Sequence, residues 1–374
     1  MGWLDPSITA VNVLSGDGQS AGDPSGVSAQ LRARSSPPAS PPPDRKNGDS
    51  VVLPPDTSID SDLLIAKRKT LVRSRHTQFA AATGLIADSR IFGKVSFATQ
   101  AISVCRPSML DSAMVLARNN VNISGAGSRA MMFAHGFGCD QHMWTEVASE
   151  FEADFRVILF DHVGAGRSDL AAYHPAKYAA LEGYAEDVVE IGRALGLKDA
   201  IFVGHSVSAM IGALATLEAP GMFSELVMVG PSPRYIDDGD YIGGFSHAQV
   251  DELLEFLADN HLGWSAAMAP AIMGNPERPE LGEKLANSFC ATDPEIARQF
   301  AHTTFFSDNR ADLPRLTART LVMQCREDII APPCVGEYVH AQIPNSEYLL
   351  LDATGHCPNL SAPKEVTAAI RAFV

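Results

Sequence analysis

Short apolar runs alternate with longer amphipathic stretches through the last two-thirds of the chain. The apolar runs predict strands at 130–135, 156–161, 200–205, 226–231, 320–325 and 348–352. Helical periodicity predicts helices at about 183–195, 207–218 and 361–373. Strands that are apolar throughout and alternate with helices are typical of a parallel sheet covered on both faces. Residues 112–374 are therefore predicted to form one α/β domain with a mostly parallel central sheet flanked by helices.

This alternation breaks between about 240 and 310, where helical patterns follow one another without a convincing strand. Pro279 and Pro294 stand where helix starts are expected, and Asp293 directly precedes the second proline. Open α/β sheets bind ligands at the carboxyl ends of their strands. We therefore predict a lid of four short helices at about 240–310 that covers this edge of the sheet.

The first 111 residues have a different composition from the rest. Residues 15–62 are rich in Gly, Ser, Pro and Asp, a composition that favours disorder. Residues 1–111 contain 12 Lys and Arg and 10 Asp but no Glu, whereas residues 112–374 contain 17 basic and 34 acidic residues. We expect residues 1–111 to be a leader that is disordered or wrongly included through a misplaced start codon. A targeting segment and a regulatory tail are the alternatives.

Charge and cysteine usage narrow the function classes. The net charge is −15, and a strongly acidic chain repels phosphate backbones, so no nucleic-acid partner is expected. No run of 18 apolar residues occurs, so no membrane span is expected. The six cysteines are scattered, without a C-x-x-C pair or the Cys/His spacing of a zinc site. We therefore expect reduced thiols, a cytoplasmic location and no metal.

The segment Gly204-His205-Ser206-Val207-Ser208 carries the strongest chemical signal. It follows a predicted strand and opens a predicted helix, the context that a nucleophile elbow requires. Such a tight turn needs small residues two positions before and after the serine, and Gly204 and Ser208 meet this need. The turn would lift the Ser206 hydroxyl clear of the backbone at a helix N-terminus, which favours nearby negative charge. A serine that merely caps a helix is the structural alternative.

A serine hydroxyl is a weak nucleophile that needs a base, and the base needs an acid to fix its tautomer. His356 follows the last predicted strand, and Asp328 follows the strand before it. The chain order Ser206, Asp328, His356 is the order found in α/β-hydrolases. Glu327 could replace Asp328 as the acid, whereas Asp352 is a poorer candidate because it ends a strand too early.

Two backbone N–H groups are candidates for an oxyanion hole. The segment His135-Gly136-Phe137-Gly138 follows the first predicted strand. Its loop can offer the N–H of Phe137, which would pair with the N–H of Val207 after the elbow serine. The glycines could also simply make a turn. Together with the three side chains above, these donors predict nucleophilic catalysis that needs no cofactor.

With these motifs identified, residues 112–374 resemble the RsbQ-type α/β-hydrolases, positive regulators of the bacterial sigma-B stress response, and the related plant strigolactone and karrikin receptors. The matching stretches are FAHGFGCDQHMW, RVILFDHVGAGRSDL, FVGHSVSAMIG, MVGPSPRYIDDGDYIGGF, FCATDPEIARQFA, FFSDNRADL, LVMQCREDIIAP and GHCP. The resemblance implies the α/β-hydrolase fold and a hydrophobic pocket beneath the lid. It also implies that this pocket is lined by Phe137, Tyr235 and Phe305, with Trp144 and Met268.

The motifs and the resemblance together predict a serine hydrolase for a small hydrophobic ester or lactone. The resemblance implies a PAS-domain phosphatase or another signalling protein as the protein partner. A ligand receptor with residual hydrolase activity is the first alternative. A carbon–carbon bond hydrolase or a perhydrolase on the same fold is the second, because both chemistries use the same three residues.

Overall fold

The computed structural model describes residues 109–374. The predicted leader therefore lies outside the described residues, except for its last three positions, which begin helix α2 (Met109–Arg118). Helix α2 contributes no fully buried residue. Its last residue, Arg118, pairs with Glu190 at 2.7 Å and with the buried Asp187 at 3.0 Å. These ion pairs tie α2 to the rest of the domain.

One seven-stranded sheet forms the centre of the described domain, in the order β1-β3-β2-β4-β5-β6-β7. All neighbouring strands are parallel except β1 and β3. The strands are β1 (Asn122–Ser124), β2 (Ala130–Ala134), β3 (Arg156–Leu159), β4 (Ala200–His205), β5 (Phe223–Val229), β6 (Arg319–Glu327) and β7 (Ser346–Thr354). The six strands predicted from apolar runs are confirmed. Strand β1 escapes such prediction because its three residues are all exposed and form no apolar run.

Helices cover both faces of this sheet. They are α3 (Thr145–Ser149), α4 (Leu181–Ala194), α5 (Val207–Glu218), α10 (Pro333–Gln342), α11 (Pro358–Ser361) and α12 (Pro363–Phe373), with short 3-10 helices η2 (Gln141–Trp144), η3 (Leu170–Ala172) and η4 (Leu313–Arg315). Side chains alternate between the faces of a strand. Met131 and Phe133 of β2 therefore pack in one hydrophobic cluster with α3 and α12, whereas Met132 and Ala134 pack in another with α4 and α5.

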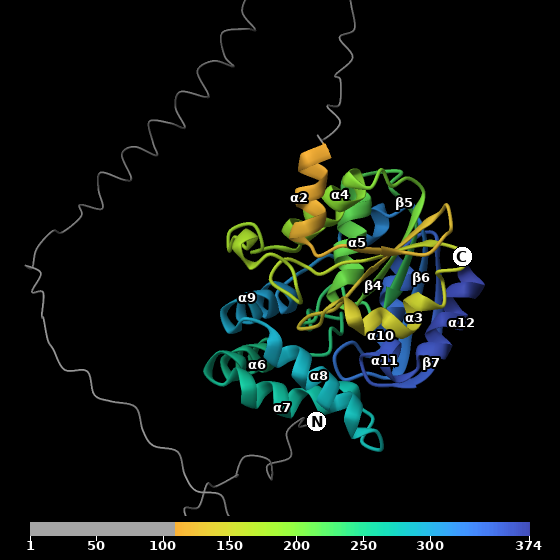
Figure 1. The fold of residues 1–374 in the computed structure, drawn as a ribbon. Helices are drawn as coiled ribbons and strands as arrows, with labels where there is room; N and C mark the ends of the chain where they lie inside the picture. Colours follow the sequence, from red (N-terminus) through yellow and green to blue (C-terminus); the bar gives the residue numbers. More distant parts are fainter. Residues whose placement is uncertain (1–108) are drawn as a thin grey trace, which may run out of the picture. The chain divides into compact units, whose positions relative to one another are not determined.

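Four further helices lie together at one end of the sheet (Figure 1). They are α6 (His247–Asp259), α7 (His261–Met273), α8 (Pro279–Ala291) and α9 (Pro294–Phe305). Pro279 and Pro294 occupy first helical positions, and the Asp293 carboxylate accepts from the first backbone N–H groups of α9. The four-helix lid predicted at about 240–310 is confirmed. Within residues 109–374, no helix is both long and apolar enough to cross a bilayer.

The parallel strands bring the candidate chemistry to one edge of the sheet. Strands β2, β4, β6 and β7 run in the same direction, so their carboxyl ends share that edge. Residues 135–138 follow β2, Ser206 follows β4, Asp328 follows β6, and His356 lies two residues beyond β7. Residues more than 200 positions apart in sequence therefore meet without any long excursion of the chain.

Candidate active site

The turn between β4 and α5 has the strained geometry expected of an elbow. Ser206 has φ 56° and ψ −124°, a conformation that few residues other than glycine adopt. Its backbone N–H donates to the carbonyl of Val229 at 2.8 Å, which anchors the turn to β5. A Cβ atom at Gly204 would lie 2.4 Å from the carbonyl oxygen of Ser208, so only glycine fits there. The chain thus holds the Ser206 side chain at the N-terminus of α5.

A continuous hydrogen-bonded chain joins the three predicted side chains. The Ser206 hydroxyl lies 2.7 Å from Nε2 of His356, and Nδ1 of His356 lies 2.7 Å from a carboxylate oxygen of Asp328. A carboxylate can only accept, so Nδ1 of His356 carries a proton and Nε2 is left to accept from Ser206. Neither alternative acid takes part, because Glu327 is exposed and Asp352 pairs with an arginine at the surface.

The Asp328 carboxylate is fixed by backbone donors. Its Oδ1 accepts from the N–H groups of Ile330 at 2.8 Å and Ala331 at 3.1 Å, while Oδ2 faces His356. The side chain is fully buried. Buried carboxylates of this kind need such donors in place of water. The loop after β6 therefore sets which oxygen meets the imidazole.

His205 supports the same site from the elbow itself. Its Nε2 donates to the carbonyl oxygen of His356 at 2.7 Å, and the two rings lie 5.1 Å apart. Complete burial lowers the pKa of His205 to about 3, so the ring is neutral at physiological pH. The residue between Gly204 and Ser206 thus holds the backbone of His356 in place. The sequence motif alone gives no sign of this role, since that position tolerates many residue types in the motif.

The two candidate oxyanion donors are free. Among the backbone and side-chain hydrogen bonds of the described residues, none uses the N–H of Phe137 or of Val207. Val207 is the first residue of α5, where N–H groups have no partner within the helix. A Cβ atom at Gly136 would lie 2.5 Å from the ring of His205, so the loop after β2 approaches the elbow closely. Both donors therefore belong to segments that meet at Ser206.

A cavity with an empty volume of about 520 Å³, part of it open to solvent, lies between this site and the lid. Its lining residues are Phe137, Cys139, His205, Ser206, Tyr235, Leu253, Trp264, Met268, Ile272, Leu285, Phe289, Thr304, Phe305, Ile330, His356 and Cys357. Four of the five residues that the resemblance implies for the pocket are in this lining: Phe137, Tyr235, Met268 and Phe305. The Tyr235 hydroxyl is 3.5 Å from the Ser206 hydroxyl, and burial raises the pKa of Tyr235 to about 12, so its phenol is neutral.

The expectation that Trp144 lines this pocket is wrong. Trp144 is fully buried beneath it, with its ring 5.3 Å from that of Phe133 and 6.5 Å from that of His205. It belongs to η2, which packs on the sheet rather than against the lid. The sequence motif places Trp144 near the loop after β2 but does not reveal which way its ring points.

Several lining residues gave no signal in the sequence. Trp264 and Phe289 come from lid helices, and their rings lie 5.3 Å apart against Phe137. Cys139 and Cys357 also line the cavity, where burial raises the pKa of Cys139 to about 12 and raises that of Cys357 well above the usual range. Both are therefore neutral thiols and poor nucleophiles. Among the described residues, no group of three or more His, Cys, Asp or Glu side chains is arranged to hold a metal ion.

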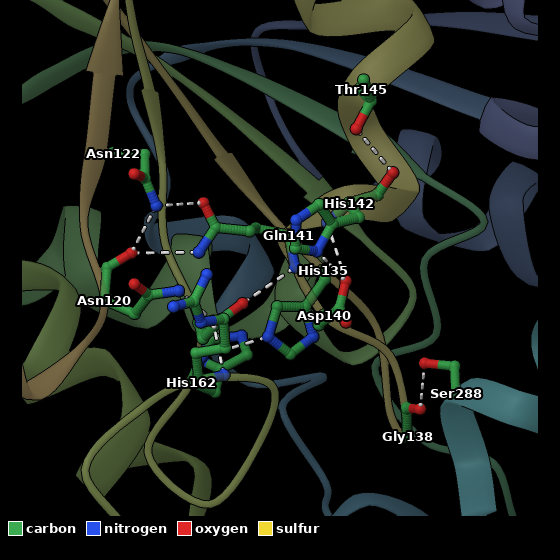
Figure 2. Close-up of polar contacts among 12 residues, drawn as sticks. Asn120, Asn122, His135, Gly138, Asp140, Gln141, His142, Thr145, His162 and Ser288 are labelled. Atoms are coloured by element: carbon green, nitrogen blue, oxygen red, sulfur yellow. Dashed lines mark hydrogen bonds and ion pairs between the residues drawn. The ribbon is translucent and has the colours of Figure 1, made fainter. Parts of the chain in front are cut away.

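The lid contacts the loop after β2 directly. Ser288 of α8 donates its hydroxyl to the carbonyl oxygen of Gly138 at 2.9 Å (Figure 2). Gly138 has φ 66°, and a Cβ atom there would lie 2.3 Å from the ring of Phe289. Backbone conformation and available space both require glycine at this position. Helix α8 of the lid therefore helps to hold the loop that carries Phe137 in place.

Comparison with known proteins agrees with this fold. Residues 131–370 match the family model described as the Alpha/beta hydrolase family. That match covers more than half of the chain, and the protein belongs to the α/β-hydrolase family.

Its relatives include esterases and receptors. The chain is 38% identical over 247 residues to the probable esterase D14L of Oryza sativa subsp. japonica, which covers 66% of this chain and 91% of that protein. It is 35% identical over 249 residues to the karrikin insensitive 2 receptor CA of Petunia hybrida, which covers 66% of this chain and 92% of that protein. The solved structure of a hydrolase from Oleispira antarctica is similar with TM-score 0.69 and 41% identity, covering 70% of this chain and 96% of that one. The resemblance to the plant receptor group is thereby confirmed.

Proposed function

We propose that this protein is a serine hydrolase that cleaves a small, uncharged, hydrophobic ester or lactone. The observation that carries the proposal is the chain of 2.7 Å contacts from Ser206 through His356 to Asp328, which opens on a mostly apolar cavity. A nucleophile, its base and an orienting acid in hydrogen-bond contact are the arrangement that acyl transfer requires.

The proposed reaction has two halves. The Ser206 oxygen attacks the substrate carbonyl carbon while Nε2 of His356 takes the hydroxyl proton, and the N–H groups of Phe137 and Val207 stabilise the resulting oxyanion. His356 then gives that proton to the leaving alkoxide oxygen, which leaves an acyl group on Ser206. A water molecule, deprotonated by His356, attacks this acyl group and releases a carboxylic acid and the restored serine. For a lactone the product is one hydroxy acid.

The cavity lining argues for an uncharged substrate. None of its residues is a lysine, arginine, aspartate or glutamate, and its histidine and tyrosine groups serve the site described above. A charged substrate would lose its hydration without gaining a partner of opposite charge.

A matched pair of esters tests this proposal. The purified protein should hydrolyse p-nitrophenyl butyrate, and it should hydrolyse mono-p-nitrophenyl succinate, which carries a carboxylate at the end of a similar acyl chain, at least about tenfold more slowly because that carboxylate would be buried unpaired. The measurement is kcat/KM for both esters at pH 7. Equal rates would contradict the uncharged substrate class, and no turnover of either ester would contradict the hydrolase assignment.

Phe305 is expected to set the size of the acyl group that fits. Its ring lies 5.1 Å from that of Tyr235 in the cavity wall, so Phe305→Ala should enlarge the cavity and move the preferred p-nitrophenyl ester to a longer acyl chain. Removing this buried ring should also cost about 3–5 kcal/mol of stability. The neighbouring Phe306 does not line the cavity, so Phe306→Ala is the matched control and should leave the chain-length preference unchanged. Turnover of p-nitrophenyl esters from acetate to octanoate measures the chain-length preference of the two variants. An unchanged preference in Phe305→Ala would remove Phe305 from the substrate site.

The second candidate function is that of a ligand receptor. Such a protein would resemble the RsbQ type, and its turnover of the ligand would serve signalling. It is favoured by the relative that is named a receptor and by the direct contact of lid helix α8 with the loop of the oxyanion donor. A PAS-domain phosphatase is the partner we propose for that role. Ligand-dependent capture of such a phosphatase by the purified protein would separate the receptor from a hydrolase that acts alone.

The proposed catalytic unit is residues 112–374, because every residue of the site lies there. Residues 1–111 take no part in the proposed steps. The cysteines at 139, 290, 325, 334 and 357 are unpaired, in keeping with the reducing cytoplasm that we propose as its location.

A further inference from the structure

Three fully buried polar side chains lie behind the loop that carries Phe137. They are His135 from that loop, His162 from the loop after β3 and Ser208 from the first turn of α5. The backbone N–H of His162 donates to Nε2 of His135 at 3.1 Å, as Figure 2 shows, and Nε2 of His162 lies 2.8 Å from the Ser208 hydroxyl. Ser208 in turn donates to the carbonyl of His135 at 2.5 Å. The three residues thus form a closed ring of hydrogen bonds that none of the proposed reaction steps uses.

The direction of each bond follows from which groups can only accept. The Ser208 hydroxyl proton goes to a carbonyl, so its oxygen accepts from His162, and Nε2 of His162 must carry a proton. Nε2 of His135 accepts from a backbone N–H, so its proton sits on Nδ1 and is donated to the carbonyl of Gly136 at 2.9 Å. Each imidazole is therefore confined to one neutral tautomer.

Burial keeps both rings in that neutral form. It lowers the pKa of His135, and it lowers the pKa of His162 well below the usual range. Protonation would also place a proton on Nδ1 of His162, a buried atom without a hydrogen-bond partner among the described residues. Asp161 and Asp140 act to raise the pKa of His135, but they do not offset the effect of burial.

The closed ring of hydrogen bonds sets the orientation of one particular peptide group. The carbonyl of Gly136 and the N–H of Phe137 belong to the same planar peptide unit and point in opposite directions. His135 holds that carbonyl through Nδ1, and Ser208 holds the preceding carbonyl, that of His135. Fixing both carbonyls therefore fixes the direction of the Phe137 N–H.

We propose that Ser208 and His162 are positioning residues for the oxyanion hole, acting through His135 on the peptide that bears the Phe137 N–H. This inference rests on the proposed serine hydrolase function. It also gives a reason for a serine at the last position of the elbow, where a glycine or alanine could not donate to the loop after β2. The same residue thereby links the segment that carries the nucleophile to the segment that carries the oxyanion donor.

Ser208→Ala tests the inference against a matched control. Loss of a whole oxyanion donor costs about 100–1,000-fold in kcat, and loss of its alignment should cost less, about 10–100-fold. The KM for p-nitrophenyl butyrate should change less than about twofold, because the interaction acts on the transition state. The control is Thr216→Val, which removes a hydroxyl-to-carbonyl bond of 2.8 Å from the same helix far from the loop and should leave kcat unchanged.

A second readout separates positioning from general loss of structure. A boronic acid inhibitor forms a tetrahedral adduct whose oxygen occupies the oxyanion hole, so its affinity should fall in Ser208→Ala by about the same factor as kcat. If Ser208→Ala does not fold, the pair His162→Gln and His162→Phe replaces it. The glutamine amide can donate at a reach similar to Nε2 and should retain more kcat than phenylalanine, which cannot donate.

Some outcomes would overturn the inference. They are kcat and inhibitor affinity within twofold of the wild type in Ser208→Ala, an equal loss of kcat in Thr216→Val, or equal activity in the two His162 variants. The proposed function fails separately, when Ser206→Ala retains turnover. An active wild type with an inactive Ser206→Ala and an unaffected Ser208→Ala would overturn only the role of the hydrogen-bonded ring.

Discussion

Ser206→Ala is expected to abolish covalent labelling by a fluorophosphonate probe and to lower kcat by about 10⁴–10⁶-fold. The hydroxyl of Ser206 is the oxygen that His356 can deprotonate at 2.7 Å, and it stands beside the free N–H groups of Phe137 and Val207. The Tyr235 hydroxyl, 3.5 Å away, cannot substitute, because its raised pKa keeps it protonated and it has no comparable contact with the base. His356→Ala should slow labelling by several orders of magnitude while the serine remains in place.

The fold should survive both changes. Alanine keeps the backbone of Ser206, whose conformation is set by the elbow, and Asp328 keeps its two backbone donors when His356 is removed. The control is Ser361→Ala, because Ser361 is also a buried serine but its hydroxyl has no hydrogen-bond partner within residues 109–374. That variant should label at the wild-type rate. Full labelling of Ser206→Ala, with its melting temperature unchanged, would remove Ser206 from the nucleophile role.

The sheet and the order of the candidate residues could be predicted because each depends on a strong local signal. Buried parallel strands are apolar on both faces, so their runs stand out, and each candidate side chain follows such a run. Strand β1 had no such signal, because its Asn122 and Ser124 flank a single exposed Ile123. An antiparallel edge strand of this kind is defined by its pairing with β3 and not by its own composition.

The cavity wall was harder to predict, because a periodic pattern shows that one face of a helix is apolar but not what that face meets. In α7, Trp264 is buried against the cavity whereas Leu262, two residues earlier, is 64% exposed. The prediction for Trp144 was wrong for the same reason, since the direction of its ring depends on how η2 packs on the sheet. The hydrogen bonds of His205, His162 and Ser208 join residues that are distant in sequence, so no local pattern contains them.

The choice between two adjacent acids likewise needed the structure. Glu327 and Asp328 are neighbours in sequence, and both follow the apolar part of β6. The chain turns after Glu327, which leaves that side chain exposed and brings Asp328 beneath His356 with the N–H groups of Ile330 and Ala331.

Asp328→Asn should lower the labelling rate by about 10⁴-fold, more than a simple loss of charge would, because the loop forces the amide into the harmful orientation. In the wild type, Oδ1 accepts from the N–H groups of Ile330 and Ala331. The amide oxygen of an asparagine must take that place, since an NH₂ group facing two N–H donors would be repelled. Its NH₂ group then faces Nδ1 of His356 and donates to it. The imidazole must carry its proton on Nε2, where it points at Ser206 and can no longer act as a base.

Glu327→Gln provides the matched control for this prediction, because it makes the same acid-to-amide change one residue earlier, on an exposed side chain. It should label within about twofold of the wild type, since exposed substitutions away from a site have small effects. The measurement is the labelling rate of both variants at one pH, with melting temperatures to confirm folding. It decides which of the two residues is the acid. A Glu327→Gln variant as damaged as His356→Ala, beside an Asp328→Asn variant that labels normally, would show that Glu327 is the acid and would leave Ser206 and His356 in their roles.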